Sequence, residues 1–153
     1  MAAKKKSAKK AQQSKSTAKA KAKSARNCAP ALFRINIEVG DVDAAARDWG
    51  ALLGLPGRPQ AGSRVYFTTG AVTLQVVEMQ PVHPAAKALY FLVDDLDDVY
   101  ARAKKLGWLS KESVHGEPGG EISVRPWGER SFYVEDTWGN PLCFVQTGTT
   151  YPG

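Results

Sequence analysis

The side chains that could do chemistry in this chain are few and widely spaced. His83 and His115 lie in loops flanked by proline or glycine without a neighbouring His or Glu at metal-ligand spacing, which favours solvated histidines over ligands or general bases. The acidic run 94–98 could supply paired carboxylates, but at the start of a predicted helix it fits capping better. Cys143 has no base near it in sequence, so a buried thiol is favoured over a nucleophile.

Three other residues suit ligand binding more than catalysis. Arg34 lies in a predicted strand of aromatic and aliphatic residues, where an inward-facing arginine would bind an anion or carboxylate. The alternation of side chains along the strand does not settle which face is inward, so a solvent-facing Arg34 is the alternative. Trp127 and Glu129 precede a predicted strand, and an indole face beside a carboxylate suits a flat or cationic ligand. The alternative is that Trp127 plugs the end of the fold and Glu129 is solvated.

The positive charge of the chain is concentrated at its N-terminus. The formal net charge is +6, from 21 basic and 15 acidic residues, yet residues 1–27 hold ten of the basic residues and no acid. The rest of the chain therefore has a net charge of −4, so a nucleic-acid contact would belong to the tail alone. The cations of the tail are Lys4, Lys5, Lys6, Lys9, Lys10, Lys15, Lys19, Lys21, Lys23 and Arg26.

The tail has no aromatic or branched aliphatic side chain to bury, so we expect residues 1–30 to be disordered and to contact nucleic acid without sequence preference. A solubilising leader is the alternative. No apolar segment has the character of a signal peptide or a membrane span, and Cys28 and Cys143 lack metal-finger or CxxC spacing. We therefore expect free thiols and a cytoplasmic protein without membrane contact.

The remaining sequence begins with alternating strand and helix signals. Residues 33–39 alternate between polar and apolar side chains, and residues 42–53 repeat apolar side chains at three- and four-residue spacing. An aspartate caps this predicted helix and Gly54 ends it. Residues 64–68 and 72–78 follow as predicted strands joined by a turn.

A second series repeats this plan. Residues 88–93 form a predicted strand, aspartates cap a helix over 99–106, and a glycine-rich segment over 110–124 is predicted as a loop with at most one short strand. The best-specified hairpin follows, because residues 131–134 and 142–146 are aromatic and β-branched and an Asp- and Gly-containing turn joins them.

The two series also match residue by residue. Segment 39–43 matches 93–97 at an offset of 54, and segment 74–77 matches 142–145 at an offset of 68. A fused pair of half-domains explains this. The sequence therefore predicts an α+β fold of paired βαβββ modules, in which each half is a curled sheet with a helix on its back and the two sheets face one another across a ligand cleft.

Three ordered blocks carry a resemblance to a known superfamily. They are Val39-x-Asp41-Val42-Asp43 to Leu53-Gly54-Leu55, Val93-x-Asp95-Leu96-Asp97 to Leu106-Gly107, and Pro126-Trp127-Gly128-Glu129-Arg130 to Gly139-Asn140-x-Leu142. Residues 31–147 thereby resemble the vicinal oxygen chelate superfamily, in particular its glyoxalase/bleomycin-resistance-like branch. The resemblance implies a domain over 31–148 with half-modules of about 31–80 and 86–148, a C-terminal tail over 149–153, and a homodimer.

The resemblance also assigns four metal-ligand positions. They fall on Arg34, Gln75, Ala88 and Cys143. Gln75 offers a weak oxygen ligand, Ala88 offers none, and Arg34 repels a cation, while Cys143 is a soft thiol among hard sites. We therefore expect no metal and no other cofactor. The expected ligand-binding residues are Arg34, Gln75, Trp127, Glu129 and Cys143.

Two functions are consistent with these observations. The first is a metal-independent module that binds and sequesters a small drug or aromatic metabolite, as the drug-binding antibiotic-resistance members of the resembling branch do. The second is a lyase- or dioxygenase-like enzyme that recruits a metal through Gln75 with Glu78 or Glu121, or works without one. The expected partners are a small molecule, a second copy of the chain and, through the tail, nucleic acid.

Overall fold

The computed structural model describes residues 30–152. The predicted disorder and nucleic-acid contacts of the tail therefore lie outside the described residues, apart from Pro30. Within the described part of the chain, no helix is long and apolar enough to cross a membrane.

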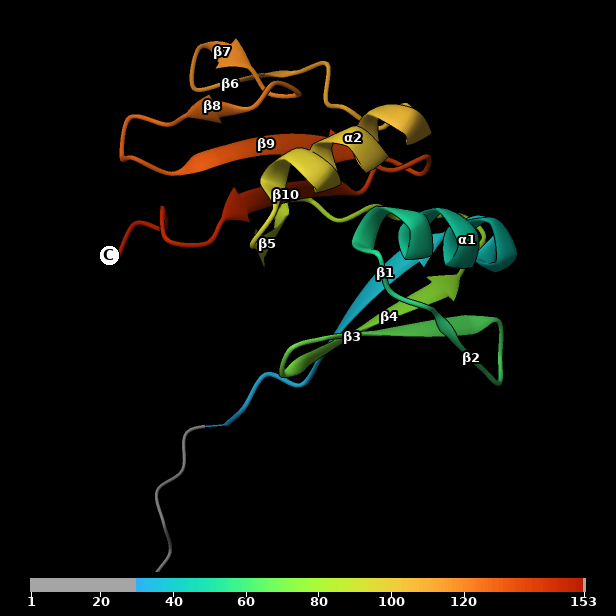
Figure 1. Ribbon diagram of the computed structural model, residues 1–153. Helices are drawn as coiled ribbons and strands as arrows, with labels where there is room; N and C mark the ends of the chain where they lie inside the picture. The colour runs from blue at the N-terminus through green and yellow to red at the C-terminus, as the bar shows by residue number, and fades with distance from the viewer. Residues whose placement is uncertain (1–29, 153) are drawn as a thin grey trace, which may run out of the picture. The chain divides into compact units, whose positions relative to one another are not determined.

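The order of helices and strands repeats once along the chain (Figure 1). The first half contains β1 (Arg34–Val39), α1 (Val42–Leu53), β2 (Arg58–Gln60), β3 (Arg64–Thr69) and β4 (Val72–Glu78). The second half contains β5 (Leu89–Val93), α2 (Leu96–Leu106), β6 (Ser113–Val114), β7 (Glu117–Pro118), β8 (Ser123–Val124), β9 (Arg130–Glu135) and β10 (Pro141–Gln146).

The two halves have the same sheet topology. Their strand orders are β1-β4-β3-β2 and β5-β10-β9-β8, while β6 pairs with β7 in a separate hairpin. In each sheet the first strand of the half runs parallel to the last, and the remaining pairs are antiparallel. β1 and β5 therefore occupy equivalent places, which confirms the predicted α+β fold of paired βαβββ modules.

Both helices begin and end where local chemistry favours it. The side chains of Asp41 and Asp95 each accept a hydrogen bond from a backbone N–H in the first turn, at 2.8 and 2.9 Å. Gly54 and Gly107 end the helices with φ of 65° and 75°, which glycine adopts without strain. Because Asp95 is the cap, α2 begins at Leu96, earlier than the predicted residue 99.

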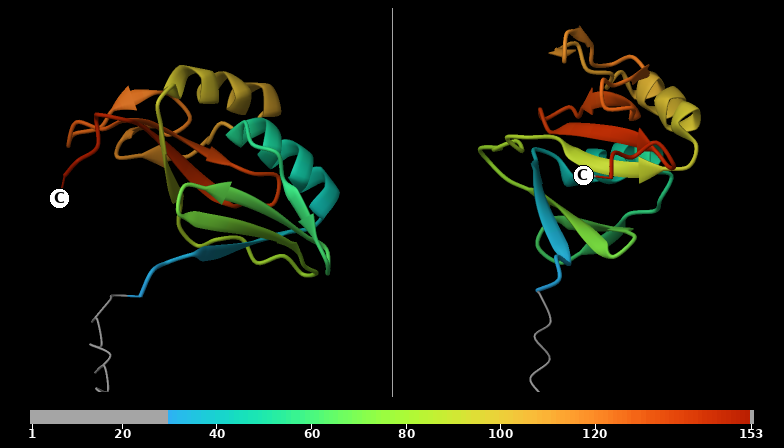
Figure 2. Two further views of the ribbon diagram at one scale, coloured as in Figure 1. Left: turned by 60° about the horizontal axis from the view of Figure 1, so that its bottom comes forward. Right: turned by 90° about the vertical axis from the view of Figure 1, so that its left-hand side faces the viewer.

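The faces of the sheets that carry the helices meet in one core. Ile37 and Val39 of β1 belong to the same buried cluster as Leu142 and Phe144 of β10. α1 and α2 contact one another, as two views show (Figures 1 and 2). Trp49 of α1 is fully buried at this junction. The prediction of helices on the backs of two facing sheets is therefore wrong on this point, because the apolar helix stripes pack together between the halves.

A polar cluster in the β9–β10 turn joins the second half to the first. Asp136, only 4% exposed, accepts hydrogen bonds from Trp49 Nε1 (3.2 Å), from the backbone N–H groups of Trp138 (2.9 Å) and Asn140 (2.8 Å), and from Asn140 Nδ2 (2.9 Å). Asn140 Nδ2 also donates to the carbonyl of Glu38 at 2.9 Å. The turn predicted from sequence thus also connects the two halves.

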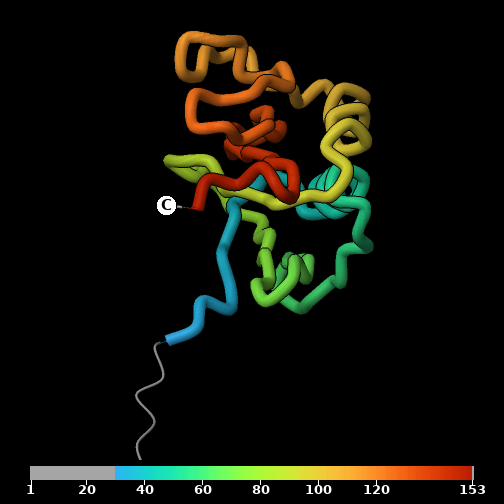
Figure 3. The backbone as a smooth tube through the Cα atoms, turned by 60° about the vertical axis from the view of Figure 1, so that its left-hand side comes forward, coloured from blue at the N-terminus to red at the C-terminus, as the bar shows by residue number. Residues whose placement is uncertain are grey.

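The segment predicted as a loop over 110–124 contains two paired strands and β8. β6 and β7 form a hairpin, and the backbone N–H of Tyr133 donates to the Gly119 carbonyl at 2.8 Å, which ties the segment to β9. Figure 3 follows this segment in orange beside the second sheet. Gly119 and Gly120 are buried, and a Cβ on Gly120 would collide with the Ser110 carbonyl. The glycines that indicated a loop therefore permit close backbone approach.

Candidate ligand-binding site

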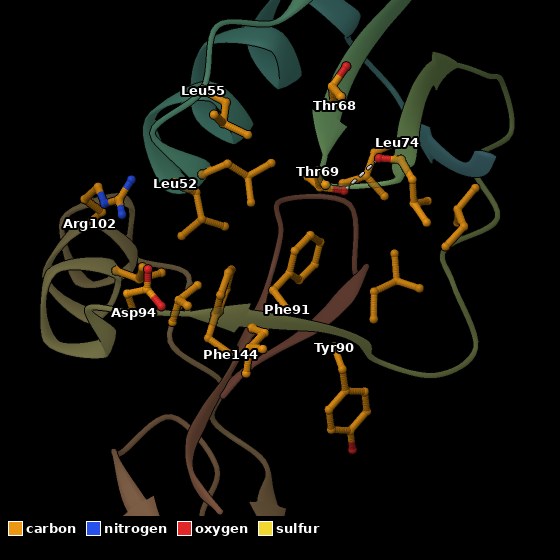
Figure 4. Close-up of a pocket in the computed structure, with 18 of the residues that line it drawn as sticks. Leu52, Leu55, Thr68, Thr69, Leu74, Tyr90, Phe91, Asp94, Arg102 and Phe144 are labelled. Carbon is orange, nitrogen blue, oxygen red and sulfur yellow. Dashed lines mark hydrogen bonds between the residues drawn. The ribbon is translucent and has the colours of Figure 1, made fainter. Parts of the chain in front are cut away.

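A cavity of about 760 Å³ opens between the two halves, on their helix-covered sides. Its walls come from both helices, from β1, β4, β5 and β10, and from the β3–β4 turn. The side chains that line it are mainly apolar and include Leu52, Leu55, Leu74, Leu89, Phe91 and Phe144 (Figure 4). We refer to this cavity as the inter-half pocket. Its volume is within the range of about 300–1,000 Å³ that small-molecule sites occupy.

One wall of the inter-half pocket is aromatic. Phe91 on β5 and Phe144 on β10 are register partners, and their rings stack with centroids 5.3 Å apart and planes 25° apart. Strand alternation places both side chains toward the core, as it does Leu89. Stacked rings present a flat apolar surface, which suits a planar ligand.

The opposite wall comes from the end of α1. After Leu52 in the last turn, the left-handed Gly54 turns the chain so that Leu55 also lies along the pocket. A side chain at Gly54 would collide with the guanidinium of Arg102. Gly54 is therefore needed chiefly for its positive φ, because the guanidinium of Arg102 is the end of a flexible side chain that can move aside.

The polar end of the pocket lies at the start of α2. Asp94, Asp95, Asp98 and Arg102 all line it, and Figure 4 shows Asp94 and Arg102 on the same side. Asp95 is the helix cap, and Asp98 Oδ2 lies 2.9 Å from Arg102 Nη2. The capping interpretation of the acidic run is thus confirmed for Asp95. The ion pair is partly exposed, at 28% for Arg102 and 60% for Asp98.

Arg34 and Gln75 lie on the first sheet, on the face that does not join the shared core. Arg34 is exposed, and its guanidinium carbon lies 4.8 Å from the centroid of the Tyr66 ring. Gln75 is 8% exposed and pairs in register with Asn36 and Tyr66. The structure thus gathers Arg34, Tyr66 and Gln75 on one face, away from the residues that line the inter-half pocket.

Trp127 and Glu129 lie beside each other before β9. Trp127 Nε1 donates to Glu129 Oε2 at 2.7 Å, and the other carboxylate oxygen accepts from the backbone N–H of Tyr151 at 3.0 Å. His115 contacts the Trp127 ring edge-on, with centroids 4.7 Å apart. The sequence placed His115 and Trp127 in separate segments, and the β6–β7 hairpin brings them together. Neither Trp127 nor Glu129 lines the inter-half pocket.

Cys143 is buried on the outer face of the second sheet, in a small cluster with Tyr133 and Val145. Burial raises the pKa of its thiol to about 11, although hydrogen bonds with Tyr133 and Ser131 oppose this shift. Burial also raises the pKa of Tyr133, whose hydroxyl lies 3.2 Å from that of Tyr90. Both groups are therefore protonated at neutral pH, which makes Cys143 a poor nucleophile.

Arg125 is a buried charge that the sequence analysis did not single out. Its side chain is 1% exposed, Nε donates to Ser131 Oγ at 3.0 Å, and Nη1 lies 3.7 Å from a carboxylate oxygen of Glu117. Its guanidinium carbon lies 5.2 Å from the centroid of the Tyr133 ring. No periodic pattern could have revealed it, because Arg125 follows β8 in a turn before Pro126.

The four family positions do not fit a metal ion. Ala88 has no donor atom, Arg34 carries a positive charge, and the remaining two positions supply only the amide of Gln75 and the soft thiol of Cys143, with no carboxylate or imidazole. Glu78 cannot assist Gln75, because the two side chains point to opposite faces of β4, and Glu78 Oε2 accepts from the Val42 N–H at 3.1 Å. Among residues 30–152, no three His, Cys, Asp or Glu side chains gather as a metal site.

Comparison with known proteins gives the same fold. Residues 31–144 match the Glyoxalase/Bleomycin resistance protein/Dioxygenase superfamily. The solved structure of Oxidase ChaP-H1 is 28% identical with a TM-score of 0.67, over 82% of this chain and 100% of that chain. Oxidase ChaP-H2 is 26% identical with a TM-score of 0.65 over the same shares. A bleomycin resistance determinant encoded on the transposon Tn5 is 19% identical, with a TM-score of 0.59 over 78% of this chain and 99% of that chain. Comparison with curated proteins finds no relative.

Proposed function

Because the chain belongs to the Glyoxalase/Bleomycin resistance protein/Dioxygenase superfamily, we propose that it binds and sequesters a small apolar or aromatic molecule without a metal ion. The observation that carries this proposal is the inter-half pocket of about 760 Å³. Its mainly apolar walls favour burial of a drug-sized ligand, at about 25 cal/mol for each Å² of apolar surface removed from water.

Metal independence is supported by the donor set. The four family positions hold one amide, one thiol, one methyl group and one guanidinium, which together do not form a hard-cation site. The lining of the inter-half pocket does contain three aspartates, but they share its polar end with Arg102, and Asp95 is engaged as a helix cap.

The residues expected from sequence to bind a ligand form a separate proposal. Arg34 and Gln75 would hold an anionic group beside the Tyr66 ring, and Trp127 with Glu129 would border a second ligand surface. Cys143 would contribute a neutral, buried wall. Homodimer formation is part of this proposal. It is supported by the edge strand β5, where Tyr90 and Leu92 are 62% and 58% exposed; both side chains also line the inter-half pocket, so a second copy placed here would border that pocket.

The N-terminal tail adds a proposal of its own. Ten cations without an acid in residues 1–27 support a non-specific contact with nucleic acid, independent of the domain. A cytoplasmic protein is consistent with such a contact, and we propose that location.

The test of sequestration is native mass spectrometry of the protein as purified from cells. Val72→Trp fills the pocket, because Val72 is partly exposed and lines it; Val124→Trp makes the same change at a 64% exposed strand residue outside it. We expect one co-purifying small molecule in the wild type and in Val124→Trp, and its loss in Val72→Trp. Retention of the same molecule in both variants would refute the pocket as the binding site.

A second candidate is an enzyme of the same fold. It is favoured by the names of two similar structures, Oxidase ChaP-H1 and Oxidase ChaP-H2, at 28% and 26% identity. A reaction in this chain would need donors other than the four family positions, or no metal. Conversion of the co-purified molecule under oxygen, faster with the wild type than with Val72→Trp, would favour the enzyme over the binding module.

A further inference from the structure

The inter-half pocket is apolar along its length and negatively charged at one end. Asp94, Asp95 and Asp98 line this end, and Arg102 is the single Lys or Arg among the lining residues. The formal charge of the lining is therefore −2 at neutral pH. An apolar pocket with a charge at one end discriminates among ligands by the sign of their polar group.

Arg102 does not offset the other two carboxylates. Its guanidinium is engaged by Asp98, with Nη2 2.9 Å from Oδ2, and lies against the end of α1 at Gly54. Asp94 has no ion-pair partner among residues 30–152, and the carboxylate of Asp95 accepts only a backbone hydrogen bond there. An anionic ligand would therefore meet the carboxylate of Asp94, which is not paired with a Lys, Arg or His side chain among residues 30–152.

One hydrogen-bond donor at this end lacks a partner. Arg102 Nε is buried and makes no hydrogen bond with the described residues. A neutral acceptor on the ligand, such as an ether or carbonyl oxygen, can satisfy the N–H of Arg102 Nε, so this donor does not require an anionic ligand.

We propose that the ligand of the inter-half pocket is a hydrophobic amine. Its flat apolar body lies against Phe91 and Phe144, and its protonated amino group lies at Asp94, the lining carboxylate that has no ion-pair or hydrogen-bond partner among residues 30–152. This inference rests on the proposed function, because it names the ligand class of the same pocket. Charge complementarity excludes a carboxylate of the same size more strongly than a neutral alcohol.

Three naphthalene probes of equal body test the charge preference: 1-naphthylmethylamine, 1-naphthylmethanol and 1-naphthylacetate. We expect full-length protein, titrated at neutral pH and low salt, to bind the amine most tightly and the carboxylate least. Because the carboxylates are exposed, each step should be about two- to fivefold. The differences should shrink as salt is raised.

Asp94→Asn should reduce the advantage of the amine over the alcohol by about two- to fivefold while leaving binding of the alcohol unchanged. The matched control is Asp43→Asn, which removes an exposed aspartate from the first turn of α1, outside the pocket. It should leave the preference intact.

Two results would overturn the inference. Equal binding of all three probes, with Val72→Trp still abolishing it, would leave the pocket standing and remove the amine preference. If none of the three probes binds, the pocket is not a ligand site and the inference falls with it. The same holds if binding weakens as the protein concentration rises, because a second copy then covers the pocket.

Discussion

Replacing Asp136 by alanine should destabilise the domain more than any exposed substitution. The buried carboxylate accepts four hydrogen bonds from three residues at 2.8–3.2 Å, and two of these donors, Trp49 Nε1 and Asn140 Nδ2, tie the β9–β10 turn to the first half. A hydrogen bond to a charged group contributes about 1.5–3 kcal/mol. These bonds are not additive, so we expect a loss of about 3–5 kcal/mol in the free energy of unfolding.

The assay is urea unfolding followed by circular dichroism, which does not depend on tryptophan emission. Trp49→Phe removes one donor and should cost about 1.5–3 kcal/mol alone but clearly less in the Asp136→Ala background. Glu121→Ala, at an exposed loop residue, is the control and should change the free energy by less than about 0.5 kcal/mol. If Asp136→Ala matched Glu121→Ala, or if the two losses simply added, the turn would not clamp the halves.

Three further predictions concern other parts of the chain. Burial raises the pKa of Cys143 from 9.0 to about 11, so the folded thiol holds its proton more tightly than the unfolded one. The contribution of the neutral thiol to the free energy of unfolding is fully present below pH 9 and is lost as the pH rises toward 11, by on the order of 1–3 kcal/mol. Urea titrations should show a smaller loss for Cys143→Ala over the same pH range. Because Arg34 is exposed, Arg34→Ala should weaken binding of a carboxylate-bearing ligand by about 0.2–1 kcal/mol in calorimetry, and an unchanged affinity would remove Arg34 from the ligand contacts. Full-length protein should bind duplex DNA with a log K against log salt slope between about −5 and −9, whereas a truncation lacking residues 1–27 should not; equal binding by both would refute a role for the tail.

The elements that sequence predicts best are those with local chemical signals. Asp41 and Gly54 bound α1 because a cap and a left-handed glycine act within a few residues. The match between segments 74–77 and 142–145 correctly places β4 and β10 as equivalent strands, each parallel to the first strand of its half. These signals require no knowledge of distant contacts.

The packing of the halves could not be predicted in the same way. Alternation shows that Ile37 and Arg34 point to opposite faces of β1, but not which face meets the other half. The hairpin of β6 and β7 has only two residues in each strand, too few for a periodic pattern. Arg125 is buried by this hairpin and β9, so its burial depends on contacts that the pattern does not encode.

A ligand cleft between the halves was expected from the sequence, with contacts from Arg34 and Cys143 through the family positions. That assignment stays a prediction, and the inter-half pocket is lined by other, core-facing residues such as Leu52 and Phe91. Those residues carry no signal beyond apolar periodicity, and a core leucine and a pocket leucine have the same pattern. Only the arrangement of the two sheets distinguishes them.

The most direct test of metal-independent binding is one titration of 1-naphthylmethanol into full-length protein, before and after treatment with a chelator, with elemental analysis of both samples. We expect the same affinity in both samples and far less than one zinc, nickel, manganese or iron ion per chain. Metal-independent binding would be contradicted by close to one such ion per chain, if binding also disappears on chelation and returns when the metal is restored.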